Sequence, residues 1–460
     1  MEKLFNPKSV VLIGATDRPG SVGLGIAKNL LSGKNKRKIF FINPNSKKVL
    51  NQKTFASILD IKEKIDLAII AVPVKFVKQV CIEVCQTNVG SCIIISSGFA
   101  EAGREGAILQ KEIKELFLEN SISLVGPNCL GVINPSVALN ASFAPEMPKQ
   151  GSIAFLSQSG ALIDSIIDKS LLENFGFSLM VSYGNEAGLS LNDFLKIAND
   201  NKDTKVIAVY LEEIKKGPEF IKIANEITKN KPIVILKGGK TQEGRLAVQS
   251  HTASLAGNEK IYAAAFQKAG VIEVETIRDL FLISQALSIY STRSAVAGWP
   301  ASNVSRSDAG WPAQSPAGNE AGWAILTNGG AVGVITADWC SRFGVKLVKI
   351  SQNNPWDILG DASSEKYQTA LISLLRQKEI SGVIFCQTLQ TMTDPLQNAK
   401  VIIEAQKQFL DKPILPLFLG GKITKKGSDF LSKNGLLNFN EPRDIALCAK
   451  FLENKTASHY

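Results

Sequence analysis

The sequence predicts an α/β protein made of three doubly wound units, each with a parallel sheet covered by helices on both faces. Short, continuously apolar runs alternate with stretches of helical spacing over most of the 460 residues, as in buried parallel strands that lie between helices. Each unit opens with a strand, a turn containing Gly or Ser, and a helix. Hydrophobic residues make up 45% of the chain and charged residues 20%, which is enough apolar material for several buried cores.

The first predicted unit covers residues 1–145. It opens with the strand Ser9–Ile13, a glycine-containing turn at Gly14–Gly20 and the helix Val22–Leu31. The other apolar runs expected to be strands are Lys38–Ile42, Leu67–Val72 and Cys92–Ser96. This alternation is typical of the doubly wound folds that bind nucleotides.

The second predicted unit, residues 146–290, repeats this plan. It begins with the strand Ser152–Leu156, a Ser/Gly turn and a helix from about Ala161, and it closes with a helix at Ile277–Ile289. Its remaining strands are expected at Leu179–Tyr183, Val206–Leu211 and Pro232–Leu236.

The third predicted unit, residues 323–455, follows a segment of different composition. Residues 291–322 are rich in Ala, Gly, Ser and Pro and repeat the motif AGWPA, so we expect a flexible linker insertion. The unit itself opens with the strand Ala324–Thr327 and a helix that runs through Asp338. Its other elements are expected at Val383–Cys386, Ile414–Leu419 and the terminal helix Ile445–Leu452.

Composition narrows the function classes. The net charge of +10 comes largely from dispersed Lys, and no arginine-rich arm or basic stripe with aromatic residues is present, so nucleic acid is not the expected partner. The seven cysteines form no CxxC pair, and Cys81 and Cys85 are interpreted as buried thiols without a metal. There is no signal peptide and no run of roughly 20 apolar residues. We therefore expect a cytoplasmic protein without a membrane span.

Three turns between a strand and a helix are candidate phosphate sites. They are Gly14–Gly23, Ser157–Gly160 and Thr327–Gly330, one in each unit. Free backbone N–H groups and the helix dipole attract anions at such positions. The first turn lacks the GxGxxG spacing, and Asn43 stands where a nicotinamide site usually has Asp or Glu. This disfavours an NAD-dependent oxidoreductase and leaves another adenine nucleotide.

Histidine is scarce in this chain. Only His251 and His459 occur, and His251 lies in the small, polar segment QSHTASLAG before a predicted helix. Neutral imidazole is a good phosphoryl acceptor near pH 7, and a carboxylate is needed to orient its other nitrogen. Glu212 and Glu213 follow the strand Val206–Leu211 at its carboxyl end, where open parallel sheets bind ligands. A structural histidine and a solvated Glu pair are the alternatives.

Several segments together resemble the NDP-forming acyl-CoA synthetases. LKGGKTQEGRLAVQSHTASLAG resembles the phosphohistidine segment of this family. GATDRPGSVG, DLAIIAVP, SSGFAEAG and GPNCLG are similar to its CoA-binding domain. LSQSGA, SYGNEAGLS and YLE are similar to its second domain, and TNGGAVGV and NPWDILGDA to its third. The similarity covers nearly all of the chain except residues 291–322 and the extreme C-terminus.

The resemblance implies a Rossmann-like CoA-binding domain followed by two flavodoxin-like domains. It implies a reversible ligase reaction in which acyl-CoA, phosphate and ADP give a carboxylic acid, CoA and ATP through an acyl phosphate and a phosphohistidine. His251 would accept the phosphoryl group and Glu212 would orient it. The implied CoA-binding residues are Gly14, Thr16, Gly20, Ser21, Gly23, Val72, Pro73, Ser97, Gly98 and Asn128. The implied phosphate-binding residues are Ser157, Gln158, Ser159, Gly160, Asn328, Gly329 and Gly330.

The resemblance also implies a partner. No ATP-grasp domain follows the third unit, so ADP or ATP with Mg²⁺ would bind on a β-type subunit of a hetero-oligomer. Three features depart from the family: Ala253 replaces a usual Gly, the turn around Ala331 and Val332 has less Gly and Pro, and residues 291–322 are inserted. The alternative function is therefore a non-catalytic, degenerate CoA-binding protein of the same family.

Overall fold

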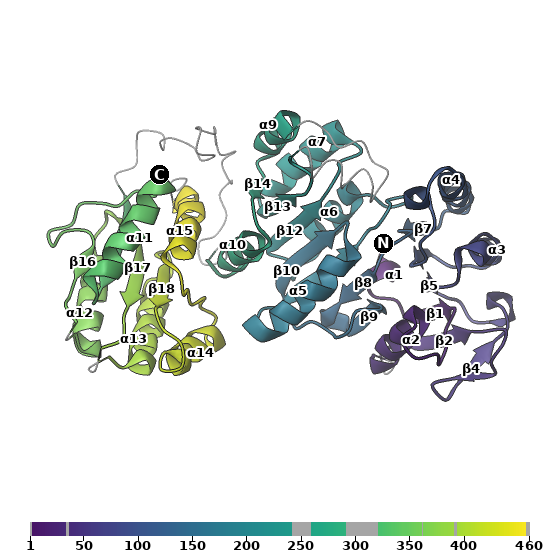
Figure 1. The fold of residues 1–460 in the computed structure, drawn as a ribbon, viewed down its shortest axis with the longest axis horizontal. Helices are drawn as coiled ribbons and strands as arrows, with labels where there is room; N and C mark the ends of the chain where they lie inside the picture. Colours follow the sequence, from purple (N-terminus) through teal and green to yellow (C-terminus); the bar gives the residue numbers. More distant parts are fainter. Residues whose placement is uncertain are drawn as a thin grey trace. The chain divides into compact units, whose positions relative to one another are not determined.

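The computed structural model describes residues 2–33, 36–241, 259–290, 321–360, 362–390 and 393–456, and Figure 1 labels their helices and strands. The chain divides into two compact units. The N-terminal unit comprises Met1–Ile227 and Ile233–Glu275, and the C-terminal unit comprises Thr228–Pro232 and Thr276–Tyr460. The predicted α/β class is confirmed, with one sheet for each of the three predicted units.

The first sheet of the N-terminal unit has the strand order β3-β4-β2-β1-β5-β6-β7. It is parallel apart from β3, which pairs antiparallel with β4. The strands are β1 (Ser9–Ile13), β2 (Lys38–Ile42), β3 (Lys48–Val49), β4 (Gln52–Phe55), β5 (Leu67–Ile70), β6 (Ser91–Ile94) and β7 (Ser123–Val125). The helices are α1 (Glu2–Phe5), α2 (Val22–Ser32), α3 (Val74–Cys85) and α4 (Arg104–Glu119).

The second sheet has the order β14-β13-β12-β10-β11-β8-β9. Its strands are β8 (Gly131–Asn134), β9 (Leu139–Ser142), β10 (Gln150–Ser157), β11 (Phe177–Ser182), β12 (Val206–Leu211), β13 (Ile233–Lys237) and β14 (Ile272–Val274). The helices are α5 (Gly160–Glu173), α6 (Leu191–Asp200), α7 (Gly217–Thr228) and α9 (Glu259–Ala269). The hairpin β8–β9 precedes the predicted boundary at residue 145, yet it pairs antiparallel with β11 as the edge of this sheet.

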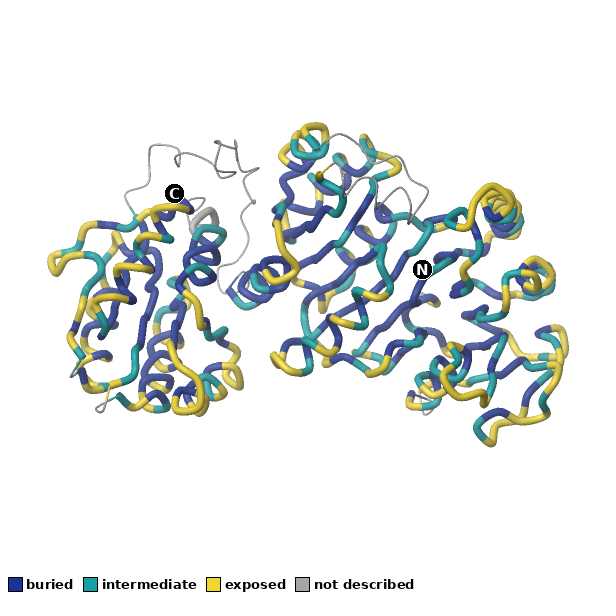
Figure 2. Tube along the Cα trace, in the orientation of Figure 1, coloured by how far each residue is buried: buried dark blue, intermediate teal, exposed yellow. Residues whose placement is uncertain are grey.

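The two sheets of the N-terminal unit share a core. In β1, Val10 and Leu12 pack in one hydrophobic cluster while Val11 and Ile13 pack in another. Apolar residues on both faces of a strand are what a parallel sheet covered by helices requires. The cluster of Val10 and Leu12 continues into the second sheet through Leu156. Figure 2 shows that the central strands are mostly buried. Each fully buried aliphatic side chain stabilises the fold by about 1.5–3 kcal/mol.

The C-terminal unit contains a four-stranded parallel sheet of order β16-β15-β17-β18. The strands are β15 (Gly322–Thr327), β16 (Trp356–Asp357), β17 (Ile380–Gln387) and β18 (Ile414–Phe418). The helices are α10 (Ile277–Tyr290), α11 (Gly330–Arg342), α12 (Ser364–Leu375), α13 (Pro395–Gln408), α14 (Lys425–Lys433) and α15 (Pro442–Thr456). Residues 291–320 of the predicted linker lie outside the described residues.

Helix α10 packs within the C-terminal unit, although the sequence places it at the end of the second predicted unit. Arg443 of α15 donates to both carboxylate oxygens of Asp279 on α10, at 2.8 and 3.1 Å. The Tyr290 hydroxyl donates to the carbonyl of Ile414 in β18 at 3.0 Å. These long-range contacts cannot be read from local helical spacing. Within the described ranges, no helix combines the length and apolar character that crossing a bilayer requires.

Candidate active site

Each of the three sheets has a topological switch point, and each predicted turn lies at one. In the first sheet β2 and β5 lie on opposite sides of β1. In the second sheet β11 and β12 flank β10 in the same way, and in the third β16 and β17 flank β15. Ligands bind outside the carboxyl ends of the strands at such points, because the adjacent connections diverge there. The turns after β1, β10 and β15 are therefore the candidate ligand-binding sites.

The first turn requires glycine at two positions. Gly14, directly after β1, has φ +101°, and a Cβ there would lie 2.3 Å from the carbonyl oxygen of Ala71. A Cβ on Gly23 would lie 2.2 Å from the carbonyl oxygen of Gly14. The start of α2 thus packs directly on the turn. Ser21 caps this helix, because its Oγ accepts from the Leu24 N–H at 3.4 Å.

Asn43 secures the first turn from the neighbouring strand. Its Nδ2 donates to the carbonyl of Ala15 at 2.8 Å, and its Oδ1 accepts from the Asn45 N–H at 2.9 Å. The side chain is therefore engaged with backbone groups, where a nicotinamide site would use a carboxylate to bind ribose. Thr16 also has an internal bond, because its Oγ1 accepts from the Arg18 N–H at 3.2 Å. Gly20 has φ +69° and is exposed.

The other residues predicted to bind CoA follow β5, β6 and β7, beside the first turn. Ser96 donates from Oγ to the carbonyl of Val72 at 2.6 Å, and Pro73 precedes α3. Gly98 has φ +104° and donates its N–H to Glu101 Oε1 at 2.7 Å. Asn128 has φ +56° and donates its N–H to the carbonyl of Ser96 at 3.0 Å. Exposed Ser97 lies between these contacts. The structure thus gathers the predicted residues at one end of the first sheet.

The second turn, Ser157–Gly160, connects β10 to α5. Ser157 Oγ accepts from the Ser159 N–H at 3.1 Å and donates to the Ser159 carbonyl at 2.8 Å. Ser159 caps α5 by accepting from the Leu162 N–H at 3.3 Å. Gln158 Oε1 accepts from the backbone N–H groups of Glu212 and Glu213. The turn after β10 and the loop after β12 are therefore tied together, as the switch point predicts.

Glu212 is a buried carboxylate, only 6% exposed, directly after β12. Its Oε1 accepts a hydrogen bond from the Tyr210 hydroxyl at 3.2 Å. Burial is the main cause that raises the pKa of Tyr210, and the Glu212 carboxylate raises it further. The phenol therefore stays protonated and serves as a donor. A Cβ on Gly238 would lie 2.9 Å from the Tyr210 hydroxyl and 3.6 Å from Glu212 Cγ, so glycine allows the next loop to approach closely.

Lys237 is a residue that sequence reasoning missed. It ends β13, pairs in register with Leu211 and is only 5% exposed. Its Nζ donates to the Gly238 carbonyl and lies 4.7 Å from the centre of the Tyr262 ring. Burial lowers the pKa of Lys237, and the nearby Glu212 carboxylate opposes that shift. A Lys that ends a continuously apolar strand was the available signal, because buried lysines need a specific partner.

The third turn, Thr327–Gly330, connects β15 to α11. Thr327 Oγ1 accepts from the Gly329 N–H and donates to the Gly329 carbonyl, both at 3.0 Å. Asn328 Oδ1 accepts from the N–H and the hydroxyl of Thr388 at 2.8 and 3.1 Å, and its Nδ2 donates to the Thr388 carbonyl at 3.1 Å. Gly329 precedes α11 without a side-chain cap. A Cβ on Gly330 would lie 3.1 Å from Asp357 Oδ2.

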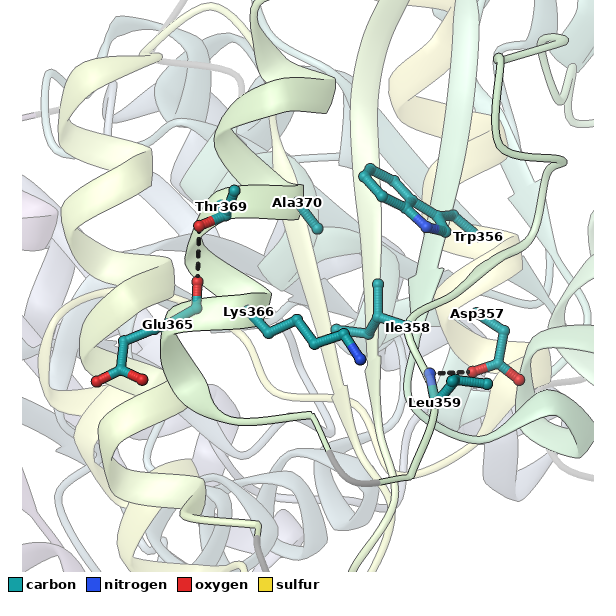
Figure 3. A pocket seen from close by; sticks show the side chains of 8 residues that line it. All are labelled: Trp356, Asp357, Ile358, Leu359, Glu365, Lys366, Thr369 and Ala370. Carbon is teal, nitrogen blue, oxygen red and sulfur yellow. Dashed lines mark hydrogen bonds between the residues drawn. The ribbon is translucent and has the colours of Figure 1, made fainter.

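A cavity of about 440 Å³ lies beside this third turn, between β16 and α12. Figure 3 shows Lys366 reaching from α12 across the cavity toward Ile358. Asp357 Oδ1 accepts from the Leu359 N–H at 2.8 Å, which holds the loop after β16. The remaining lining residues are Trp356, Glu365, Thr369 and Ala370. The cavity therefore combines apolar walls with both signs of charge.

His251 lies outside the described residues, as does the whole segment 242–258. Its role as phosphoryl acceptor stays a prediction. Among the described site residues, the structure brings Glu212 together with the Ser157–Gly160 turn, and it places the predicted CoA residues along the carboxyl end of the first sheet. Asn328–Gly330 occupy the equivalent place in the C-terminal unit. No cluster of three or more metal-binding side chains occurs in the described ranges.

The fold and these turns define an α/β protein with a candidate ligand-binding turn at the switch point of each sheet. A family model described as a CoA binding domain matches residues 8–135, and one described as a succinyl-CoA ligase like flavodoxin domain matches residues 150–287. The chain is 35% identical to the α subunit of ADP-forming acetate–CoA ligase II from Pyrococcus furiosus, over 98% of this chain and 96% of that subunit. The chain therefore belongs to the ADP-forming acid–CoA ligase family, and the predicted family resemblance is confirmed.

Two further similarities fit this family. ADP-forming acetate–CoA ligase I from Archaeoglobus fulgidus is 36% identical over 96% of this chain, which spans only 62% of that longer relative. The solved structure of dinucleotide-forming acetyl-coenzyme A synthetase 1 from Ca. Korarchaeum cryptofilum, in complex with phosphate and ADP, is 30% identical. It superposes with a TM-score of 0.87, covering 99% of this chain and 97% of that chain.

Proposed function

We propose that this chain is the CoA- and phosphoryl-binding subunit of an ADP-forming acid–CoA ligase. Phosphate would attack the thioester carbonyl, the C–S bond would break, and CoA would leave as the thiol with an acyl phosphate as product. His251 would then attack phosphorus, forming an N–P bond as the P–O bond to the acyl group breaks and the carboxylate leaves. Transfer from phosphohistidine to ADP gives ATP and completes a reversible sequence.

The observation that carries this proposal is the pairing of a buried carboxylate with a phosphate-type turn. Gln158 accepts from the backbone N–H groups of Glu212 and Glu213, which holds the Glu212 loop against the start of α5. A helix N-terminus favours an anionic phosphoryl group. A buried carboxylate favours an oriented imidazole, because it accepts from one ring nitrogen and leaves the other to react. The first turn with Val72 and Pro73 would bind CoA.

A partner completes the proposal. The name "subunit alpha" of the Pyrococcus relative supports a second chain, and the longer Archaeoglobus enzyme supports additional domains for the reaction. We propose that an ATP-grasp subunit supplies the nucleotide site with Mg²⁺ in a hetero-oligomer. All seven cysteines are free, which supports a reducing, cytoplasmic location.

The test is phosphorylation of His251. The chain is incubated with an ATP-grasp partner, Mg²⁺ and [γ-³²P]ATP, and acid-labile, base-stable label is measured. His251→Asn is expected to abolish the label, since it removes the nucleophile, and to leave CoA affinity within about twofold, since CoA is bound by the first sheet. CoA binding by a wild-type chain that takes up no label would instead identify a non-catalytic CoA-binding protein.

A further inference from the structure

The motifs GPNCLG and SYGNEAGLS interlock within the N-terminal unit. Gly184, after β11, has φ +51°, and a Cβ there would lie 2.3 Å from the Pro127 carbonyl oxygen and 2.4 Å from that of Asn128. The N–H of Asn185 donates to the Pro127 carbonyl at 3.0 Å. Only glycine permits so close an approach without displacing backbone. The loop after β11 is therefore fixed against Asn128, one of the residues predicted to bind CoA.

Asn185 is the centre of this junction. Its Nδ2 donates to Glu101 Oε2 at 2.5 Å and to Gln110 Oε1 at 2.9 Å. Its Oδ1 accepts from Asn128 Nδ2 at 3.3 Å. Its backbone carbonyl accepts from Lys215 Nζ at 2.6 Å. A primary amide supplies two donors and an acceptor at one site, and no other short side chain does so.

Glu101 extends the junction to Gly98, another of the residues predicted to bind CoA. Its Oε1 accepts from the N–H groups of Gly98 and Phe99 at 2.7 and 3.1 Å, while Oε2 accepts from Asn185. Burial would raise the pKa of Glu101, but hydrogen bonds from Asn185 and from these N–H groups outweigh it and hold the pKa below its usual value. The carboxylate is thus ionised and makes charge-assisted bonds, which are shorter and stronger than neutral ones.

Lys215 extends the junction in the other direction. It lies three residues after Glu212, in the loop that Gln158 holds at the second switch point. Besides Asn185 it faces Glu186, with Nζ and Oε2 3.9 Å apart. Glu186 is buried, and its Oε1 accepts from the Leu191 N–H at 2.7 Å. One asparagine therefore contacts the loops after β6 and β7 of the first sheet and the loop after β12 of the second sheet.

We propose that Asn185 is a positioning residue for the thioester step, which sets the CoA-side residues Gly98 and Asn128 at a fixed distance from the phosphoryl side at Glu212. The inference rests on the proposed function. Attack of phosphate on the thioester needs both sites in register, and small misplacements slow such reactions strongly. Transfer of phosphorus from an acyl phosphate to His251 does not involve CoA. Loss of Asn185 should therefore slow the attack of phosphate on the thioester and leave the phosphoryl transfer to His251 nearly unchanged.

The experiment compares two sources of label, with the ATP-grasp partner present. Label from [³²P]phosphate plus acetyl-CoA requires the thioester step, whereas label from [³²P]acetyl phosphate bypasses it. Asn185→Ala is expected to slow the first at least about tenfold and the second less than about twofold. Asn185→Asp should slow labelling from [³²P]phosphate plus acetyl-CoA even more. This change replaces the two N–H donors of the amide by a carboxylate oxygen that faces the Glu101 carboxylate.

Controls separate positioning from general damage. Asn225→Ala removes the hydrogen bond of 3.1 Å from Asn225 Nδ2 on α7 to the Lys268 carbonyl, far from Asn185 in the sequence, and should change neither labelling rate. If Asn185→Ala fails to fold, Gln110→Ala is the second variant. It removes the Oε1 that accepts from Asn185 and from the Ala100 N–H, and it should give the same selectivity with a smaller effect. Equal slowing in both assays, or no slowing in either, overturns the proposal. A wild-type chain that takes up label from neither source overturns the proposed function, and this inference with it.

Discussion

The turn after β10 and the turn after β15 share one hydrogen-bonding pattern. In each, the hydroxyl of the last strand residue bonds both the N–H and the carbonyl two residues on: Ser157 with Ser159, and Thr327 with Gly329. In each, the next residue is an amide that reaches the first residue after the neighbouring strand. Gln158 reaches Glu212 in this way. The sequences of the two turns share only a glycine, so the similarity lies in the bonding pattern.

The two turns differ in what lies opposite them. Asn328 bonds Thr388, a neutral residue, where Gln158 bonds buried Glu212. Ser159 caps α5 with its side chain, whereas Gly329 leaves α11 without a side-chain cap. The same backbone plan thus offers an anion site twice, but the carboxylate beside the turn after β10 is the buried Glu212, whereas the one beside the turn after β15 is the exposed Asp357. This difference supports the proposal that the histidine acts in the N-terminal unit.

The largest expected effect comes from removing that carboxylate. Glu212→Gln should slow the formation of acid-labile label by about 100-fold, because the amide can no longer hold the imidazole through an ionised acceptor. Thr388→Val is the matched change at the turn after β15, and it should slow labelling less than about threefold. Rapid-quench labelling with [γ-³²P]ATP measures both rates. The reverse ranking would move the histidine site to the C-terminal unit.

A smaller effect is expected from Gly329→Ser, which gives the turn after β15 the residue of its counterpart. A Cβ at this position would lie 2.7 Å from Thr388 Oγ1 and 2.8 Å from Thr388 Cγ2. The side chain of Thr388 must move and lose its bond to Asn328, so we expect a loss of about 2 kcal/mol in stability. Urea unfolding followed by circular dichroism measures the change. An unchanged midpoint would mean that the two turns are interchangeable, with Thr388 free to rotate.

Local patterns predicted the strands and the turns well. Ser9–Ile13 and Val206–Leu211 were expected with the bounds that the structure has, because continuous apolar runs between helices leave little choice. The three switch-point turns were also predicted, because Gly and Ser between a strand and a helix indicate a turn that can bind an anion. The resemblance to the ligase family added residue roles that periodicity alone cannot supply.

Long-range packing was not predictable in the same way. The hairpin β8–β9 joins the second sheet, and α10 packs on α15, through contacts between residues far apart in the sequence. The bonding of Gln158 is another case: its Oε1 accepts from the N–H groups of Glu212 and Glu213, a contact that the sequence does not predict, and its role as a phosphate ligand stays a prediction. Lys237 lies one residue beyond the predicted strand Pro232–Leu236, and its burial beside Tyr262 depends on α9.

The smallest expected effect concerns the fifth residue of α5 and of α11, the helices that follow the two compared turns. In α11 this is Val334, which is 57% exposed, and in α5 it is Asp164, whose Oδ1 is buried with no hydrogen-bond partner in the described part of the chain. Burial raises the pKa of Asp164 from its usual 3.8 to about 6. The folded state therefore binds this proton more tightly than the unfolded state. Stability must fall as pH rises between these two values, when the buried carboxyl ionises.

Asp164→Asn removes this titration and should flatten the corresponding part of the pH profile of stability. Relative to wild type, the variant should gain about 1 kcal/mol between pH 4 and pH 7, after allowance for solvent screening of a half-exposed group. Urea midpoints at several pH values, taken as the difference between wild type and variant, measure the gain. Asp168→Asn, an exposed change one turn further along α5, is the control. A difference that stays constant with pH would show that Asp164 is solvated, and that α5 and α11 begin in equally open surroundings.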